Sequence, residues 1–179
     1  MKISSGITKF LILIGLSFFI SFSASAKGKL TLYCSVGADV CEMIVQAFEK
    51  ETGINTAMTR KSSGETLAQI KAESSNPKGD VWFGGTGDPH LTMAQEGLSY
   101  QYKSIHFDDL REAAQQQAVN GDYRTVGIYI GALGYGYNAS LMSDKNLPLP
   151  TSWMDLLDPV YKGHIQMANP NSSGTAYTT

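Results

Sequence analysis

The sequence predicts an α/β fold with a mainly parallel sheet, and three observations support this. From residue 29 onward, short β-prone runs alternate with segments of helical apolar periodicity. Glycine follows the first helical segment, and capping residues precede the next two. Strands that alternate with helices in this way pair in parallel, with helices covering both faces of the sheet.

The first three elements are a strand, a helix and a second strand. Residues 29–34 carry β-branched and aromatic side chains without Gly or Pro, which favours a strand. The next segment repeats apolar residues at i, i+3, i+4, i+7 and i+8 and ends at Gly53. These positions are Val40, Met43, Ile44, Ala47 and Phe48. Residues 54–59 then alternate as a second strand.

Two further helices and a third strand follow. Ser62 and Glu65 form a capping box that opens the second helix. Its buried face is predicted to consist of Leu67, Ala68, Ile70 and Ala72. A strand over 80–84 leads to a third helix that starts at Asp88–Pro89, with a stripe of Leu91, Ala94 and Leu98. A polar helical stretch is expected around residues 108–119.

The pattern changes after residue 122. Residues 123–138 are β-prone and rich in glycine, so this run is expected to cross from one lobe of the protein to another. Beyond it the sequence predicts a short helix over 152–157 and a strand over 164–168. Residues 169–175 read as a loop that opens another helix.

The first 26 residues have the pattern of an export signal. Lys2 and Lys9 precede an apolar run over 10–22, and Ala24-Ser-Ala26 supplies the small residues of a cleavage site. A transmembrane anchor is the alternative, but the apolar run is shorter than the roughly 20 residues that span a bilayer. We therefore expect cleavage after Ala26 and secretion to the periplasm. The formal net charge of −2 and the absence of basic runs argue against a nucleic-acid partner.

The chain has two cysteines, Cys34 and Cys41. An even count in an exported protein favours a disulfide, and the C-x6-C spacing differs from redox and zinc motifs. The three histidines, His90, His106 and His164, lack metal-ligand spacing. No hydrolase or P-loop motif occurs, and Gly134–Ala139 matches a dinucleotide fingerprint without the long helix that should follow. We expect no cofactor, no metal site and no enzymatic activity.

The candidate ligand-binding residues lie where strands give way to helices. The first turn of a helix has unpaired N–H groups and a positive end, so it favours phosphate or carboxylate. Any one such loop is more often only a helix cap, but several at one edge of a sheet make an anion site plausible. Arg60 either supplies positive charge to a bound phosphate or lies solvated on the surface. Asp88 is interpreted as a helix cap that contacts sugar hydroxyls. The candidates are Ser35, Arg60, Ser62, Ser63, Gly64, Thr86, Asp88, Ser172, Ser173, Gly174 and Thr175.

These same stretches carry a family resemblance. Leu32–Ser35, Arg60 with Ser62–Thr66, Asp80–Thr86 with Asp88–His90, and Asn169–Tyr177 resemble family 1 extracellular solute-binding proteins of ABC importers. The nearest subgroup is labelled ferric-iron binding, and some of its members bind hexose phosphates. The resemblance covers essentially the whole mature chain.

The resemblance implies a type II periplasmic binding fold with two lobes and a hinge. Lobe one would span 27–132, and residues 133–179 would hold the hinge crossing and the start of a truncated lobe two. An ABC permease and its ATPase would be the partners of a monomeric receptor. Ferric-binding relatives use paired tyrosines from lobe two, in a region that would lie beyond Thr179.

Three functional hypotheses remain at this stage. The leading one is capture of an anionic solute, a hexose phosphate above all, because the junction loops offer neutral hydroxyl and N–H donors. Ferric-ion binding is the second, although iron prefers anionic oxygen ligands. A secreted phosphate-ester hydrolase is the third, and it lacks a recognisable nucleophile–base pair.

Overall fold

A three-stranded parallel sheet forms the centre of the first half of the protein. The computed structural model describes residues 28–179, so the expected signal peptide lies outside the described residues. Strands β1 (Lys29–Cys34), β2 (Asn55–Arg60) and β3 (Val81–Phe83) pair in the order β2-β1-β3. Because consecutive strands are parallel, their carboxyl ends all lie at the same edge of the sheet. This confirms the predicted α/β architecture.

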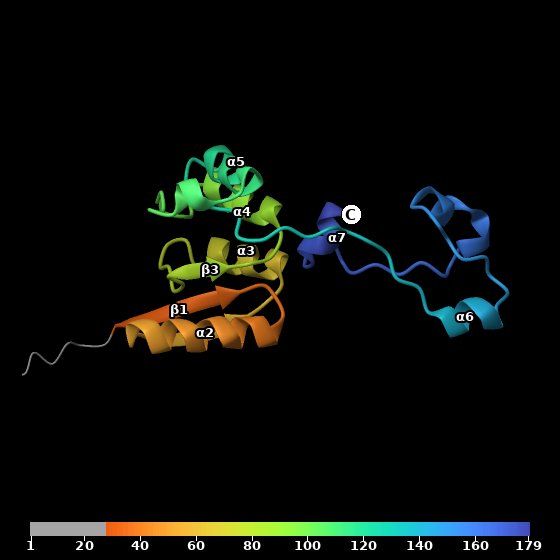
Figure 1. Ribbon diagram of the computed structural model, residues 1–179, viewed down its shortest axis with the longest axis horizontal. Helices are drawn as coiled ribbons and strands as arrows, with labels where there is room; N and C mark the ends of the chain where they lie inside the picture. The colour runs from red at the N-terminus through yellow and green to blue at the C-terminus, as the bar shows by residue number, and fades with distance from the viewer. Residues whose placement is uncertain (1–27) are drawn as a thin grey trace, which may run out of the picture.

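Six α-helices and three short 3-10 helices accompany the sheet in the described residues. The α-helices are α2 (Ala38–Thr52), α3 (Ser63–Ala72), α4 (Gly87–Gln95), α5 (Glu112–Asn120), α6 (Ala139–Asp144) and α7 (Gly174–Thr178). The 3-10 helices are η2 (Phe107–Asp109), η3 (Met154–Leu157) and η4 (Pro159–Tyr161). Helix α2 contacts β2, while α4 contacts α3, α5 and α7 (Figure 1). None of the described helices is long and apolar enough to cross a membrane.

The Cys34–Cys41 disulfide is the centre of the core. The bond ties the end of β1 to the first turn of α2, and both cysteines are fully buried together with Leu32. Val45 and Met58 pack against this cluster from α2 and β2. The predicted disulfide is therefore confirmed, and it encloses the loop that follows β1.

Local sequence signals set the end of α2 and the start of α3 as predicted, but the predicted Asp88 cap of the next helix is wrong. Gly53 terminates α2 in a left-handed conformation with φ 69°, and its N–H donates to Glu49 O. Ser62 and Glu65 form the capping box that starts α3. Helix α4 begins at Gly87 after Thr86, so Asp88 lies within its first turn and does not cap it.

The predicted buried faces of α2 and α3 are partly wrong. Met43 is 61% exposed and Ala47 is exposed, because the side of α2 that packs on the core cluster carries Cys41 and Val45. On α3 the predicted core residues Ala68 and Ala72 are exposed, whereas the hydroxyl residues Ser63 and Thr66 are buried. Side-chain hydrogen bonds to the strand ends decide this face, and they outweigh apolar periodicity.

The second half of the chain contains no strand among its described residues, so the predicted strand over 164–168 is wrong, and the β-prone run over 123–138 forms no strand either. An extended run forms a strand only when a neighbouring strand pairs with it. The chain instead runs out to α6, η3 and η4 and returns to α7 beside α4 (Figure 1). Apolar side chains of these runs, such as Ile130 and Ile165, are exposed. The lobe boundary at residue 132 stays a prediction.

Candidate anion-binding site

Three strand-to-helix loops and one later loop meet at the carboxyl edge of the sheet. Ser35 follows β1, the first turn of α3 follows β2, and Gly84–Thr86 follow β3. The Asn169–Gly174 loop joins them from the second half of the chain, through hydrogen bonds to α3. Residues separated by more than 100 positions in the sequence thus form one polar cluster.

Ser35 links the cluster to β3 and α3 by side-chain hydrogen bonds. Its Oγ accepts a hydrogen bond from Trp82 Nε1 at 2.8 Å and lies 3.1 Å from Thr66 Oγ1. Thr66 is 1% exposed and its Oγ1 also lies 2.9 Å from Ser62 O, so when Thr66 donates to that carbonyl, Ser35 donates to Thr66. The Ser35 hydroxyl therefore has no proton left for a ligand in this arrangement. It holds the start of α3 in place.

The first turn of α3 presents two donors to a single oxygen atom. The Ser62 hydroxyl lies 2.6 Å and the Gly64 N–H nitrogen 3.0 Å from the carbonyl oxygen of Ser172. A Cβ at Gly64 would lie 2.8 Å from the same oxygen and would also collide with Asn171 O. Glycine is therefore required for this close approach, and the positive end of α3 favours the acceptor.

Glu65 competes for the Ser62 hydroxyl. The hydroxyl also lies 2.7 Å from Glu65 Oε2, which accepts the Ser62 N–H at 3.1 Å. These two hydrogen bonds, the hydroxyl one first, lower the pKa of the Glu65 carboxyl, and the charges of Lys61 and Arg60 add to the effect. A hydroxyl has one proton, so an acceptor at the Ser172 position withdraws it from Glu65.

The turn after β3 forms another side of the cluster. Gly84 and Gly85 both adopt left-handed conformations, with φ 77° and 96°, which carry the chain abruptly into α4. Thr86 N then donates to the buried Ser63 Oγ at 3.2 Å. The buried Thr86 Oγ1 has no hydrogen-bond partner in the described part of the chain, and a Cβ at Gly174 would collide with it.

The remaining predicted site residues have other contacts. Arg60 Nε donates to Val36 O at 3.0 Å, and Asp88 Oδ2 accepts from Thr178 Oγ1 at 3.1 Å. Ser173 caps α7 by accepting the Ala176 N–H at 3.3 Å. Thr175 is exposed on the first turn of α7. The structure thus brings Ser35, Ser62, Ser63, Gly64, Thr86, Ser172 and Gly174 together. It gives Arg60, Asp88 and Ser173 other partners and leaves Thr175 exposed.

Sequence reasoning missed a layer of residues behind the cluster. Trp82 stacks on His90 with ring centroids 3.7 Å apart, and His90 Nε2 lies 2.8 Å from Gly84 O. Burial lowers the pKa of His90, and the hydrogen bond to Gly84 opposes this shift. The neutral ring donates to the carbonyl through Nε2. Thr66 carried a usable signal, since it lies four residues after Ser62 on the same helical face.

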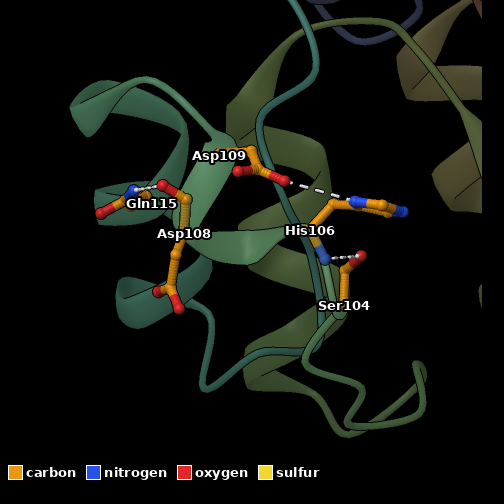
Figure 2. A network of polar contacts seen from close by, with 5 residues as sticks. All are labelled: Ser104, His106, Asp108, Asp109 and Gln115. Atoms are coloured by element: carbon orange, nitrogen blue, oxygen red, sulfur yellow. Dashed lines mark hydrogen bonds and ion pairs between the residues drawn. The ribbon is translucent and has the colours of Figure 1, made fainter.

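The other two histidines lie away from the cluster. Figure 2 shows His106 among exposed groups near η2, where its Nδ1 lies 3.3 Å from Asp109 Oδ2. Its backbone N–H donates to Ser104 Oγ at 3.1 Å. His164 is exposed after η4. Within residues 28–179, no group of three or more His, Cys, Asp or Glu residues could hold a metal ion.

The chain matches one family model and several known proteins. The family model for bacterial extracellular solute-binding proteins matches residues 80–179. An uncharacterized protein of Haemophilus influenzae is 41% identical over 178 residues, which cover 99% of this chain and 51% of that protein. A putative 2-aminoethylphosphonate-binding periplasmic protein of Salmonella typhimurium is 29% identical over 132 residues, or 73% of this chain and 35% of that protein.

Solved structures share the same fold. The periplasmic binding protein AfuA from Actinobacillus pleuropneumoniae, with exogenous fructose-6-phosphate bound, is 40% identical with a TM-score of 0.79; the match covers 86% of this chain and 48% of AfuA. The periplasmic binding protein P5PA is 37% identical with a TM-score of 0.79, over 84% of this chain and 48% of that one. Iron-bound HitA from Pseudomonas aeruginosa is 24% identical with a TM-score of 0.54, over 75% and 42% of the two chains, and supports the fold alone. The matches span between 35% and 51% of the length of these relatives.

Proposed function

This chain belongs to the bacterial extracellular solute-binding protein family, and from that premise we propose that it captures a phosphorylated hexose in the periplasm for an ABC importer. The cleaved signal peptide, the permease and ATPase partners, the monomeric state and the absence of enzymatic activity are parts of the same proposal. The fructose-6-phosphate bound to AfuA supports the substrate class.

The observation that carries the proposal is the convergence of two donors at α3. The Ser62 hydroxyl and the Gly64 N–H meet at one oxygen, 2.6 and 3.0 Å away. A phosphate oxygen makes the same contacts as the Ser172 carbonyl and carries more negative charge, so it interacts better with the positive end of the helix. The unpaired Thr86 Oγ1, beside Gly174, adds a third donor.

Residues of this site have distinct proposed roles. Ser62, Gly64 and Thr86 bind phosphate oxygens, whereas Ser35 and Ser63 orient the loops that carry them. Residues 172–174 approach from the opposite side, and their Ser172 carbonyl gives way to the phosphate. Neutral hydroxyl and N–H donors suit a phosphate or phosphonate better than ferric iron, which prefers anionic oxygen ligands.

Calorimetric titration of the purified chain with fructose 6-phosphate tests the proposal. We expect saturable binding that is weaker with inorganic phosphate, because a sugar ring adds contacts. Ser62→Ala should weaken binding about tenfold or more, since a hydrogen bond to a charged group contributes roughly 1.5–3 kcal/mol. The matched control is Ser104→Ala, which removes a half-buried serine hydroxyl near η2.

The same titration separates the alternatives. Binding of 2-aminoethylphosphonate in place of fructose 6-phosphate would move the substrate class to phosphonates. Binding of ferric citrate with a charge-transfer absorbance, and no response to phosphate esters, would refute the proposal in favour of iron. Release of inorganic phosphate from the ester would indicate a hydrolase.

A further inference from the structure

The Tyr129 side chain is hydrogen-bonded to the turn that precedes Thr86 in the candidate site. Its hydroxyl oxygen accepts the Gly85 N–H at 2.8 Å and donates to the Gly85 carbonyl, also at 2.8 Å. One side chain thus holds both backbone polar groups of a single residue. Contacts of this kind fix the orientation of the two peptide units that flank Gly85.

The turn needs such a contact because its own residues restrict it weakly. Gly84 and Gly85 are consecutive and both have positive φ, a region that glycine enters without steric cost and leaves as easily. On the other side, the turn is held by His90 at Gly84 O and by Ser63 at Thr86 N. Tyr129 supplies the hydrogen bonds at the residue between these two anchors.

Tyr129 itself belongs to a different part of the chain. It lies in the extended segment that leaves α5 and leads to α6, and it is 55% exposed. Removing only its hydroxyl therefore changes little buried surface. Both Gly85 contacts are exposed, so water can replace the lost partner without leaving a buried polar group unpaired.

We propose that Tyr129 is a positioning residue for ligand binding, which holds the Gly84–Thr86 turn in the conformation that places Thr86 Oγ1 in the site. The inference rests on the proposed function, because the turn is useful in this conformation only if Thr86 meets a ligand. It also links the site to the segment between α5 and α6, so a displacement of that segment reaches Thr86 through one hydroxyl group.

The test compares Tyr129→Phe with Tyr137→Phe in the purified chain. Tyr137 lies in the same segment and is 49% exposed, but both hydrogen bonds to Gly85 come from Tyr129. The first measurement is amide hydrogen exchange at Gly85 without any ligand. The loss of both contacts in Tyr129→Phe should speed this exchange about tenfold, while Tyr137→Phe leaves it unchanged.

The second measurement is the affinity for fructose 6-phosphate. Tyr129→Phe should weaken binding roughly three- to tenfold. The ligand must then order the turn itself, which costs about as much free energy as one hydrogen bond contributes to stability. The melting temperature should stay within about 1 °C of the wild type, as expected for a surface substitution. Combined with Ser63→Ala, the effect on affinity should be non-additive, since both residues hold the same turn.

Each result decides a separate point. Unchanged Gly85 exchange in Tyr129→Phe overturns the inference, as does faster exchange with unchanged affinity, because the contact is then only structural. A wild-type chain that ignores fructose 6-phosphate refutes the substrate proposed above. The ligand-free exchange experiment still decides in that case whether Tyr129 holds the turn.

Discussion

Opening the Cys34–Cys41 disulfide should lower the free energy of unfolding by an amount that the loop length sets. The two cysteines are seven positions apart, so the bond closes a loop of about eight residues. For a loop of that size the chain-entropy relation gives about 2.5 kcal/mol at 25 °C. Both cysteines are fully buried, so their sulfur atoms contribute packing as well.

Two variants of the perturbation separate these contributions. Protein that is reduced in denaturant and refolded under reductant keeps both sulfur atoms and should lose only the loop term. Cys34→Ala with Cys41→Ala removes the atoms too and should cost about 1–2 kcal/mol more, because a cavity forms in the core. Urea unfolding of the oxidised, reduced and double-alanine forms measures the differences.

The result that would refute this reasoning is an unfolding free energy that is equal in the oxidised and reduced forms. The disulfide would then not restrict the unfolded chain as the loop model requires. A reduced form that is destabilised by 2–3 kcal/mol but whose affinity for ligand is unchanged would show that the bond stabilises the core without shaping the enclosed Ser35 loop.

Two further predictions concern pH. Burial lowers the pKa of His90, so this side chain binds a proton more readily in the unfolded chain than in the folded one. The free energy of unfolding should therefore fall as the pH drops below about 6.5. Between pH 7.5 and 5.5, the urea midpoint of the wild type should decrease by more than that of His90→Gln. Hydrogen bonds from the Thr151 backbone, and then from the Ser152 side chain, lower the pKa of Asp155 from 3.8 to about 2. Its stabilisation of the turn before η3 is present above pH 3.8 and is lost as the pH falls toward 2, so the Thr151 amide resonance should titrate near pH 2, and Asp155→Asn should abolish this titration.

The sequence by itself determined the parts of the fold that depend on neighbouring residues. The capping box at Ser62, the glycine end of α2 at Gly53 and the alternation of strands with helices are local, because each is set within one helical turn or one strand. The Cys34–Cys41 pair was equally accessible, since an exported chain with two cysteines has one pairing. The hydroxyl and glycine residues at the junctions followed from the same local signals.

Only the tertiary structure decided which of these residues meet and what each hydroxyl does. Ser62 and Ser172 lie 110 positions apart, and no local pattern predicts that a donor of one reaches the carbonyl of the other. The hydrogen bonds open to the Ser35 hydroxyl depend on Thr66 and Trp82, and through Thr66 on Ser62, and only the tertiary structure brings these residues together. The β-prone run over 123–138 forms no strand because a ladder needs a neighbour, and strand pairing is a long-range property that periodicity does not contain.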